Sequence, residues 1–179
     1  ELHRRVASGP TPIAKESHVS MERVAIVASV RTPIGKFLGS FADVSAAELG
    51  AIAVRGLFER AGASAGDADE LIFGCARQAG GGPNMARQVS MASGIAKERP
   101  AFTVNQACGS GLTSILIAAD RIRLGRARIV VAGGAENMTG IVEGNADTSS
   151  DIESFLISDG RKQRETSHSV LYCIERYFR

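Results

Sequence analysis

The feature of this sequence that most constrains its fold is a series of four short runs that are apolar almost throughout. They span residues 24–30, 71–75, 101–105 and 129–134. A strand with water on one face alternates apolar and polar residues, whereas an unbroken apolar run of this length is typical of a strand covered on both faces. Segments with helical periodicity separate the runs. The order predicts an α/β fold, βαβαβαβ, with a mixed, mostly parallel sheet, right-handed crossovers and helices on both faces.

Helix start and stop signals mark the segments between the runs. Ser45 and Glu48 form the S-x-x-E pattern of a capping box, and Gly62 supplies a C-terminal glycine for the same helix. A shorter helix is predicted over 84–93, and a third over 110–124. The third helix is expected to bury one apolar stripe. The stripe consists of Leu112, Ile115, Leu116, Ala119 and Ile122.

The two ends of the chain lack this pattern. Residues 1–20 contain two prolines and no periodicity, so they are predicted to be a disordered leader or tag before a folded domain over 21–139. A processed targeting remnant is the alternative. Residues 140–179 are predicted to be a divergent tail with a short helix over 151–158 and a last helix that begins at Ser169. The apolar face of that last helix would consist of Val170, Cys173, Ile174, Tyr177 and Phe178.

The composition excludes several classes of protein. The 179 residues are 44% hydrophobic and 22% charged with a net charge of +2, which is ordinary for a globular domain and too weakly basic to indicate nucleic acid as a partner. No apolar run approaches the roughly 18 residues that a membrane span needs, so no membrane partner is expected. Cys75, Cys108 and Cys173 form neither a CxxC nor a Cys/His zinc pattern, and no metal is expected. Sparse free thiols indicate a reducing compartment, either the cytoplasm or, if the leader is a targeting remnant, the mitochondrial matrix.

Cys108 is the strongest candidate for a reactive side chain. It lies between the third run and the third helix, at the first turn of a helix that we expect to be buried. Unpaired amide groups and the helix dipole favour a thiolate there, and a thiolate is the nucleophile that acyl transfer from a thioester needs. Gly109 and Gly111 leave room for an acyl group and leave backbone amides for an oxyanion. The alternative is a buried structural cysteine, and the residues by themselves leave both interpretations open.

Four short motifs occur in a fixed order along the chain. They are Val-Arg-Thr-Pro-Ile-Gly-Lys-Phe over 30–37, Gln-Ala-Gly followed by Asn-Met-Ala-Arg-Gln over 78–88, Val-Asn-Gln-Ala-Cys-Gly-Ser-Gly over 104–111, and Gly-Gly-Ala-Glu-Asn-Met over 133–138. Together they resemble the thiolases, acyl-CoA acyltransferases that include the acetyl-CoA acetyltransferases and the 3-ketoacyl-CoA thiolases. The resemblance covers 21–139 and corresponds to the N-terminal half of a thiolase only.

The resemblance implies a reaction and a role for Cys108. In thiolases the cysteine at this position takes the acyl group from acyl-CoA as a thioester, and a second acyl-CoA attacks that thioester in a ping-pong cycle. The reaction is the Claisen condensation of two acetyl-CoA to acetoacetyl-CoA or, in reverse, thiolysis of a 3-ketoacyl-CoA in fatty acid metabolism. Coenzyme A thioesters are then the substrates, and no covalently bound cofactor is implied. Asn105 would shape the nucleophile turn with Gly109 and Gly111, although an ordinary strand-end hydrogen bond explains Asn105 equally well.

The resemblance also implies what the matched half lacks. Thiolases are about twice as long as this chain and stack two similar halves into a five-layer αβαβα sandwich. The second half supplies an activating histidine, an asparagine–histidine element and a cysteine in a Cys-x-Gly-Gly-Gly context, and none of these motifs occurs here. Two functions stay open: an acyltransferase, inactive or active as this chain alone, and a non-catalytic module for coenzyme A binding or assembly. The strand at 102–105 lies at the dimer interface of the family, which implies a homodimer, with a tetramer as the alternative.

A few other side chains invite a chemical interpretation. Glu136 suggests acid–base catalysis, but its place after a strand, in a Gly-Gly-x-Glu-x-Met context, favours a structural role. Cys75 is expected in the core and Cys173 in helix packing. Lys36 and Arg87 are candidates for contact with a coenzyme A phosphate, with a solvated surface position as the default for both.

Overall fold

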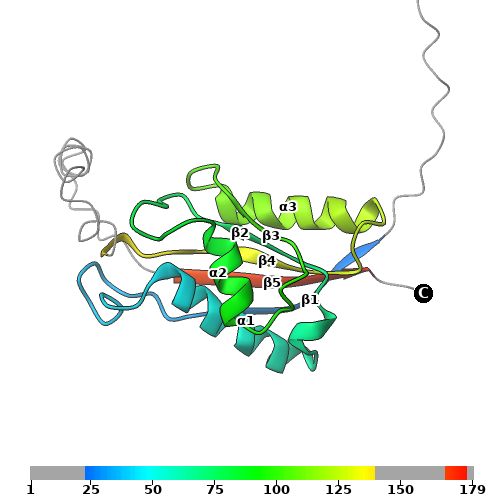
Figure 1. Ribbon diagram of the computed structural model, residues 1–179, viewed down its shortest axis with the longest axis horizontal. Coiled ribbons are helices and arrows are strands. Elements are labelled where there is room, and N and C mark those ends of the chain that lie inside the picture. Colours follow the sequence, from blue (N-terminus) through cyan, green and yellow to red (C-terminus); the bar gives the residue numbers. More distant parts are fainter. Residues whose placement is uncertain (1–22, 140–167, 177–179) are drawn as a thin grey trace, which may run out of the picture.

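The computed structural model describes residues 23–139 and the backbone of 168–176 (Figure 1). Strands and helices alternate along the described chain, which confirms the predicted α/β class. The elements are β1 (Val24–Arg31), α1 (Ala46–Ala61), the 3-10 turn η1 (Ala65–Asp67), β2 (Glu70–Gly74), α2 (Met85–Ala92), β3 (Ala101–Val104), α3 (Ser110–Arg123), β4 (Ile129–Glu136) and β5 (His168–Arg176). None of the helices within these two ranges has the length and apolar character needed to cross a bilayer.

The five strands form one sheet in the order β1-β5-β4-β2-β3. β2 runs parallel to both β3 and β4, whereas β5 is antiparallel to its two neighbours, β1 and β4. The first four strands of the chain therefore point in one direction, and the carboxyl ends of β2, β3 and β4 meet at one edge of the sheet. In parallel sheets of this kind, that edge is where functional loops gather.

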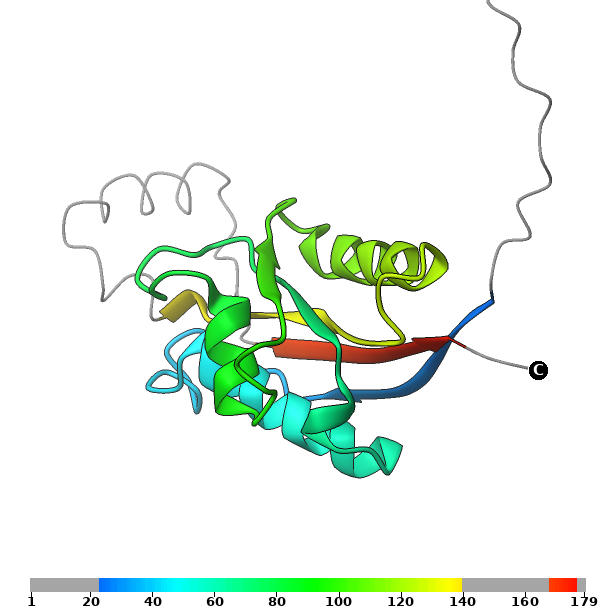
Figure 2. The same ribbon diagram turned by 45° about the vertical axis from the view of Figure 1, so that its right-hand side comes forward.

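Helices cover both faces of the sheet, as predicted. α1 and α2 lie on one face and α3 lies on the other (Figures 1 and 2). Within β2, Leu71 and Phe73 belong to the core under α1 and α2, while Ile72 belongs to the core under α3. All three side chains are fully buried, which explains why these consecutive positions of the strand are all apolar rather than alternately apolar and polar.

The helix ends follow the local chemistry of the sequence. The Glu48 amide donates to Ser45 Oγ at 3.1 Å, and the Glu48 carboxylate accepts the Ser45 amide at 2.9 Å, so the predicted capping box is present. Gly62 ends α1 with a φ of 64°, a backbone conformation that glycine adopts without strain. Asn84 caps α2, and its side-chain oxygen accepts the Arg87 amide at 3.2 Å.

The predicted apolar stripe of α3 is correct at Ile115 and Ile122, which pack on the sheet, but wrong at Leu112 and Leu116. The buried residues of the helix are Ser110, Ser114, Ala118 and Ile122. Leu112 and Leu116 are instead 64% and 56% exposed. The reason is a close approach between helix and sheet, because the Ser114 hydroxyl donates to the carbonyl of Gly133 at 2.8 Å. Small side chains allow that distance, whereas leucines on the same face would hold the helix away.

The helix predicted to begin at Ser169 is also wrong, because residues 168–176 form strand β5. β5 lies between β1 and β4 and pairs with both along its length, for example Cys173 with Ala28 and with Val131. A short apolar run is compatible with one face of a helix or with a strand. Here the segment forms a strand because it is hydrogen-bonded to β1 on one side and to β4 on the other. The leader over 1–20 and the helix predicted over 151–158 lie outside the described residues.

Candidate functional site

The loops that follow β2, β3 and β4 are joined by hydrogen bonds at the carboxyl edge of the sheet. Asn105, just after β3, donates from Nδ2 to the carbonyl of Ala76, just after β2, at 3.0 Å. Glu136, the last residue of β4, accepts the amides of Ala76 at 2.9 Å and Arg77 at 2.8 Å. The ends of β2, β3 and β4 are therefore linked by hydrogen bonds. The turn that carries Cys108 begins at Asn105, one of the linked residues.

Cys108 lies on a tight turn and is exposed. The residue before it, Ala107, has a φ of 48°, which costs a non-glycine residue about 1 kcal/mol and needs support from its surroundings. Asn105 Oδ1 accepts the Ala107 amide at 3.1 Å. Ser110 Oγ accepts the Gln106 amide at 2.8 Å and donates to the Ala107 carbonyl at 2.6 Å. These contacts hold the turn so that the thiol is presented to solvent at the start of α3.

Two glycines in the sheet set the position of the turn. A Cβ added at Gly74 would lie 2.5 Å from the carbonyl carbon of Ser110 and 2.6 Å from the amide nitrogen of Gly111. A Cβ added at Gly134 would lie 2.7 Å from the Gly74 carbonyl oxygen. The backbone at the start of α3 therefore rests directly on the end of β2. A side chain at Gly74 would move the helix start, and with it Cys108, whereas one at Gly134 would displace the end of β2 on which that helix start rests.

The other predicted site residues share this turn. A Cβ added at Gly109 would lie 3.3 Å from the Gln106 carbonyl oxygen, so this glycine allows the chain to turn tightly. A Cβ added at Gly111 would meet no atom within 4 Å, which leaves open space beside the turn. Asn105 makes one hydrogen bond within the turn and one to Ala76, which is more than an ordinary strand-end contact.

Cys75 follows β2 at the same edge of the sheet but has a very different environment. It is only 3% exposed, as expected for a core cysteine. Its Sγ lies 3.6 Å from Glu136 Oε1 and 3.4 Å from the Arg77 carbonyl oxygen. Burial, together with the charge and hydrogen bond of Glu136, raises the pKa of the Cys75 thiol to about 12. Cys75 therefore stays a neutral thiol at physiological pH.

The contact between Glu136 and the loop after β2 was not predicted from the sequence. The two segments are about 60 residues apart in the chain. The available signal was the pattern of strand ends, because Cys75 ends one apolar run and Glu136 lies two residues after another, and both runs were predicted to lie in one parallel sheet. Both Glu136 oxygens accept main-chain amides, which agrees with the structural role that the sequence favoured over acid–base catalysis.

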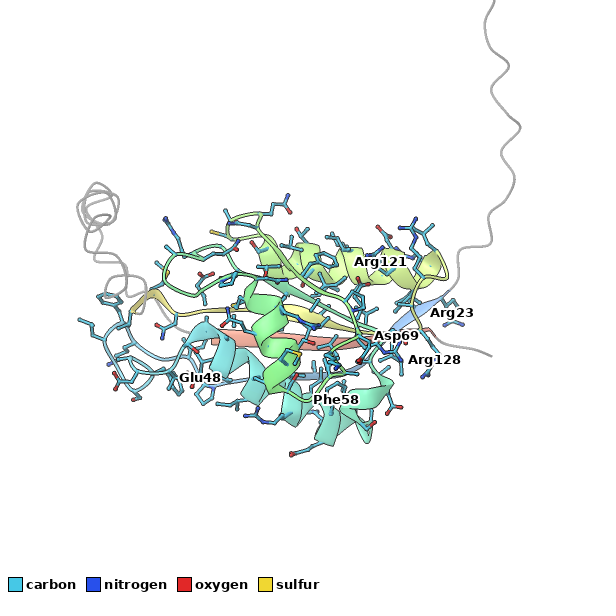
Figure 3. The ribbon with its side chains drawn as sticks, viewed as in Figure 1. Arg23, Glu48, Phe58, Asp69, Arg121 and Arg128 are labelled. Atoms are coloured by element: carbon cyan, nitrogen blue, oxygen red, sulfur yellow. The ribbon has the colours of Figure 1, made fainter. Side chains whose placement is uncertain are left out.

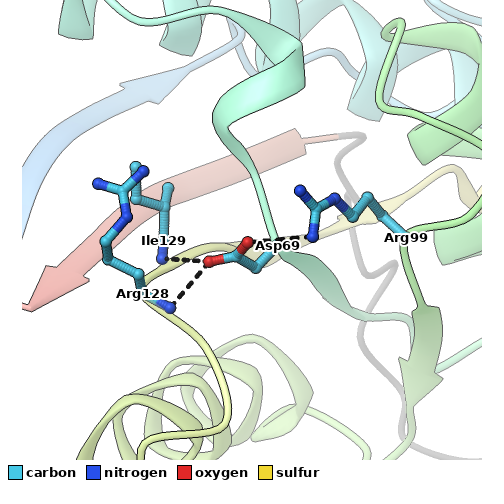
Figure 4. Close-up of polar contacts among 4 residues, drawn as sticks. All are labelled: Asp69, Arg99, Arg128 and Ile129. Atoms are coloured by element: carbon cyan, nitrogen blue, oxygen red, sulfur yellow. Dashed lines mark hydrogen bonds and ion pairs between the residues drawn. The ribbon is translucent and has the colours of Figure 1, made fainter.

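The opposite, amino edge of the sheet holds a second carboxylate bound to two main-chain amides. Asp69 Oδ2 accepts the amides of Arg128 at 2.8 Å and Ile129 at 3.1 Å, and Arg99 lies 3.2 Å from Asp69 Oδ1 (Figure 4). Burial acts to raise the pKa of Asp69, but these amide bonds and the charges of Arg99 and Arg128 outweigh it and lower the pKa. Figure 3 shows Asp69 and Arg128 close together at this edge. The pair joins β2 to β4 without any recorded contact to Cys108.

Arg87 is occupied by contacts to the main chain. Its guanidinium donates to the carbonyls of Lys97 at 2.6 Å and Arg99 at 3.0 Å, which ties α2 to the loop before β3. Those bonds engage both terminal nitrogens of the guanidinium in main-chain contacts. Over the two described ranges, no set of three or more His, Cys, Asp and Glu side chains lies close enough to hold a metal ion.

Comparison with known proteins shows which family this chain is similar to. The family model of the thiolase N-terminal domain matches residues 24–176, so the match includes β5, which the sequence had assigned to a divergent tail. An acetyl-CoA acetyltransferase of Syntrophomonas wolfei is 50% identical over 64% of this chain and 29% of its own length, and one of Escherichia coli is 48% identical over 66% and 30%.

Solved structures give the same result. The Acat5 thiolase of Ascaris suum in complex with coenzyme A superposes with a TM-score of 0.64 at 38% identity, over 65% of this chain and 30% of that one. The acetyl-CoA acetyltransferase of Bacillus anthracis superposes with the same score at 36% identity, over 66% and 30%. The chain thus spans about three tenths of the length of these relatives. Since the family model covers most of the sequence, the chain belongs to the family defined by the thiolase N-terminal domain.

Proposed function

We propose that this chain takes part in acyl transfer of the thiolase type, with Cys108 as the residue that carries the acyl group. The Cys108 thiolate attacks the carbonyl carbon of an acyl-CoA, the bond from that carbon to the coenzyme A sulfur breaks, and coenzyme A leaves as a thiolate that takes up a proton. In the condensation a second acetyl-CoA gives its α-proton to a base and its α-carbon bonds to the acyl carbon, whereas in thiolysis the coenzyme A thiolate attacks that carbon. In both cases the bond from the acyl carbon to sulfur breaks and Cys108 leaves as a thiolate. Family membership and relatives named acetyl-CoA acetyltransferase support this reaction.

The single observation that carries the proposal is the exposure of Cys108. A structural cysteine is normally buried, as Cys75 is, and would not need a strained turn to display it. Cys108 instead follows Ala107 at a positive φ and precedes the first turn of α3. The positive end of the helix dipole lies there, which favours an anionic tetrahedral intermediate.

The neighbouring residues have supporting roles in the same proposal. Asn105 supports the turn by accepting the Ala107 amide, and Gly109 lets the chain turn tightly. The open space beside Gly111 leaves room for an acyl group. Coenzyme A thioesters are the substrates, as the coenzyme A complex of the Ascaris suum thiolase suggests. A homodimer is supported by the position of β3, which is the outermost strand of the sheet and pairs only with β2 among the described strands.

The experiment is to detect the acyl-enzyme directly. The chain is incubated with acetyl-CoA, and the protein is analysed by intact mass and then by peptide mapping. We expect one acetyl group on the peptide that contains Cys108, none in a Cys108→Ala variant, and an unchanged result in a Cys75→Ala variant. Acetyl-CoA should also protect Cys108 from iodoacetamide. If saturating acetyl-CoA gives no adduct and no protection, acyl transfer by Cys108 is excluded and only the non-catalytic module remains.

A further inference from the structure

Glu136 is separated from the Cys108 turn in sequence but connected to it by a continuous set of hydrogen bonds. The connection begins at the carboxylate, which accepts the amide of Ala76 on Oε2 at 2.9 Å and that of Arg77 on Oε1 at 2.8 Å. A carboxylate has no hydrogen to donate, so both of its oxygens suit main-chain amides. The loop after β2 is therefore fixed against the end of β4.

The second step passes through the residue that Glu136 holds. Ala76 gives its amide to Glu136 and accepts the Asn105 Nδ2 group on its carbonyl at 3.0 Å. A shift of this one residue would disturb both contacts together. Asn105 is thereby oriented from β2 and not only from its own strand.

The third step reaches the turn itself. With Nδ2 engaged by Ala76, the Asn105 side chain presents Oδ1 to the amide of Ala107 at 3.1 Å. Ala107 is the residue with a φ of 48°, and it precedes Cys108 directly. Because both Nδ2 and Oδ1 of Asn105 are hydrogen-bonded, its side-chain amide can hold Ala107 in the left-handed conformation. A side-chain amide that rotated freely would do so only part of the time.

We propose that Glu136 is a positioning residue for the Cys108 nucleophile, acting through Ala76 and Asn105. The inference rests on the proposed function only in naming Cys108 as the nucleophile. Glu136 has no recorded contact with Cys108, and its two oxygens are used by amides, so it does not act as the acid or base of the reaction. Its part is to fix where the sulfur stands relative to the start of α3.

The test compares two substitutions that remove the same kind of contact at opposite edges of one sheet. Glu136→Gln turns one acceptor into an amide donor that faces a main-chain N–H group. Asp69→Asn is the matched control, because Asp69 also accepts two main-chain amides, from Arg128 and Ile129, but has no recorded link to the Cys108 turn. Both variants should lose stability, so a general loosening of the fold would affect Cys108 equally in the two.

We expect Glu136→Gln to slow acetylation of Cys108 by about 10-fold to 100-fold at saturating acetyl-CoA, with little change in the acetyl-CoA concentration at half-saturation. Alkylation of Cys108 by iodoacetamide should slow as well, because its rate depends on where the sulfur stands relative to the start of α3. Access does not limit the rate, since the thiol is already exposed. Glu136→Asp keeps a carboxylate and should recover part of both rates. Asp69→Asn should leave both rates within about twofold of the unmodified chain.

A double-mutant cycle with Asn105→Ala tests the route. If Glu136 acts through Asn105, then Glu136→Gln has no further effect on Cys108 in the Asn105→Ala background. Additive effects, or equal slowing by Asp69→Asn, would overturn the inference. Should Glu136→Gln fail to fold, Asn105→Ala alone must still slow alkylation of Cys108, and an unchanged rate would overturn it. The alkylation readout needs no acyl transfer, so a chain that is never acetylated contradicts the proposed function and leaves this inference intact.

Discussion

Two cysteines at the same edge of the sheet have opposite environments, and this difference can be measured. Cys108 is exposed, whereas Cys75 is buried beside Glu136, which raises the pKa of its thiol to about 12. Alkylation requires the thiolate. We therefore expect iodoacetamide at neutral pH to label Cys108 and to leave Cys75 unmodified in the folded chain, with urea-unfolded protein as the control in which both react. Peptide mapping by mass spectrometry checks this, and comparable labelling of both in the folded chain would contradict it.

The Cys75 thiol also makes the stability of the fold depend on alkaline pH. Its pKa is about 12 when folded and near the ordinary value of 9.0 when unfolded. The unfolded chain therefore loses the proton first, and the free energy of unfolding should fall as the pH rises from about 9 towards 12. Cys75→Ser keeps a hydroxyl beside Glu136 but removes this titration. Urea unfolding across that range should give a shallower decline for Cys75→Ser, and parallel curves would contradict the expectation.

At the scale of elements, the contact between α3 and the sheet depends on Gly74. A Cβ there would meet backbone atoms of Ser110 and Gly111 at 2.5 Å and 2.6 Å, and backbone cannot move aside as a side chain can. We expect Gly74→Ala to lower the free energy of unfolding by about 3 kcal/mol, since the helix start must shift. The shift should also slow alkylation of Cys108. Denaturant unfolding and the labelling rate measure the two effects.

Gly56 provides the matched control for that substitution. It lies inside α1, and a Cβ added there would meet nothing within 4 Å. Gly56→Ala should therefore raise the free energy of unfolding by about 1 kcal/mol through helix propensity. The same glycine-to-alanine change would then lower the free energy of unfolding at Gly74 and raise it at Gly56. Destabilisation of similar size at both would show that the close approach at Gly74 is not the cause.

Some elements are determined by residues close together in the sequence, and others by contacts with neighbouring elements in the fold. The Ser45–Glu48 capping box and the fully buried strand β2 were predicted from the sequence because their signals lie within a few residues of one another. The buried face of α3 was predicted only at its C-terminal end, because the close approach over Gly74 is a tertiary contact that favours serine and alanine over leucine near the helix start. β5 was not predicted either, since only its pairing with β1 and β4 makes a strand of that apolar run.

The candidate site divides in the same way. The place of Cys108 and Asn105 between a strand and a helix could be predicted, because both belong to one turn of the chain. The contacts of Glu136 could not, because they join segments about 60 residues apart and depend on the order of strands in the sheet. Sequence motifs thus indicated the proposed nucleophile, while the structure was needed to find the contacts that support its turn.

At the scale of the whole molecule, the outer face of α3 carries leucines that the fold does not cover. Leu112 and Leu116 lie one turn apart and are 64% and 56% exposed, on the side of the helix away from Ser110 and Ser114. Exposed apolar side chains that adjoin one another favour association. The chain also spans about three tenths of the length of its relatives, so a surface that is open here need not be open in them.

We therefore expect this chain by itself to associate through the outer face of α3. Light scattering after size exclusion should give a mass above the 18.8 kDa of one chain, and the mass should rise with protein concentration. Replacing Leu112 and Leu116 by glutamine should abolish the rise of mass with concentration and leave no species larger than the homodimer proposed through the edge of β3. The change should cost less than about 0.5 kcal/mol in unfolding free energy, because both side chains are already in water. A monomer at every concentration, or an assembly that the double substitution leaves unchanged, would show that this face is not the contact.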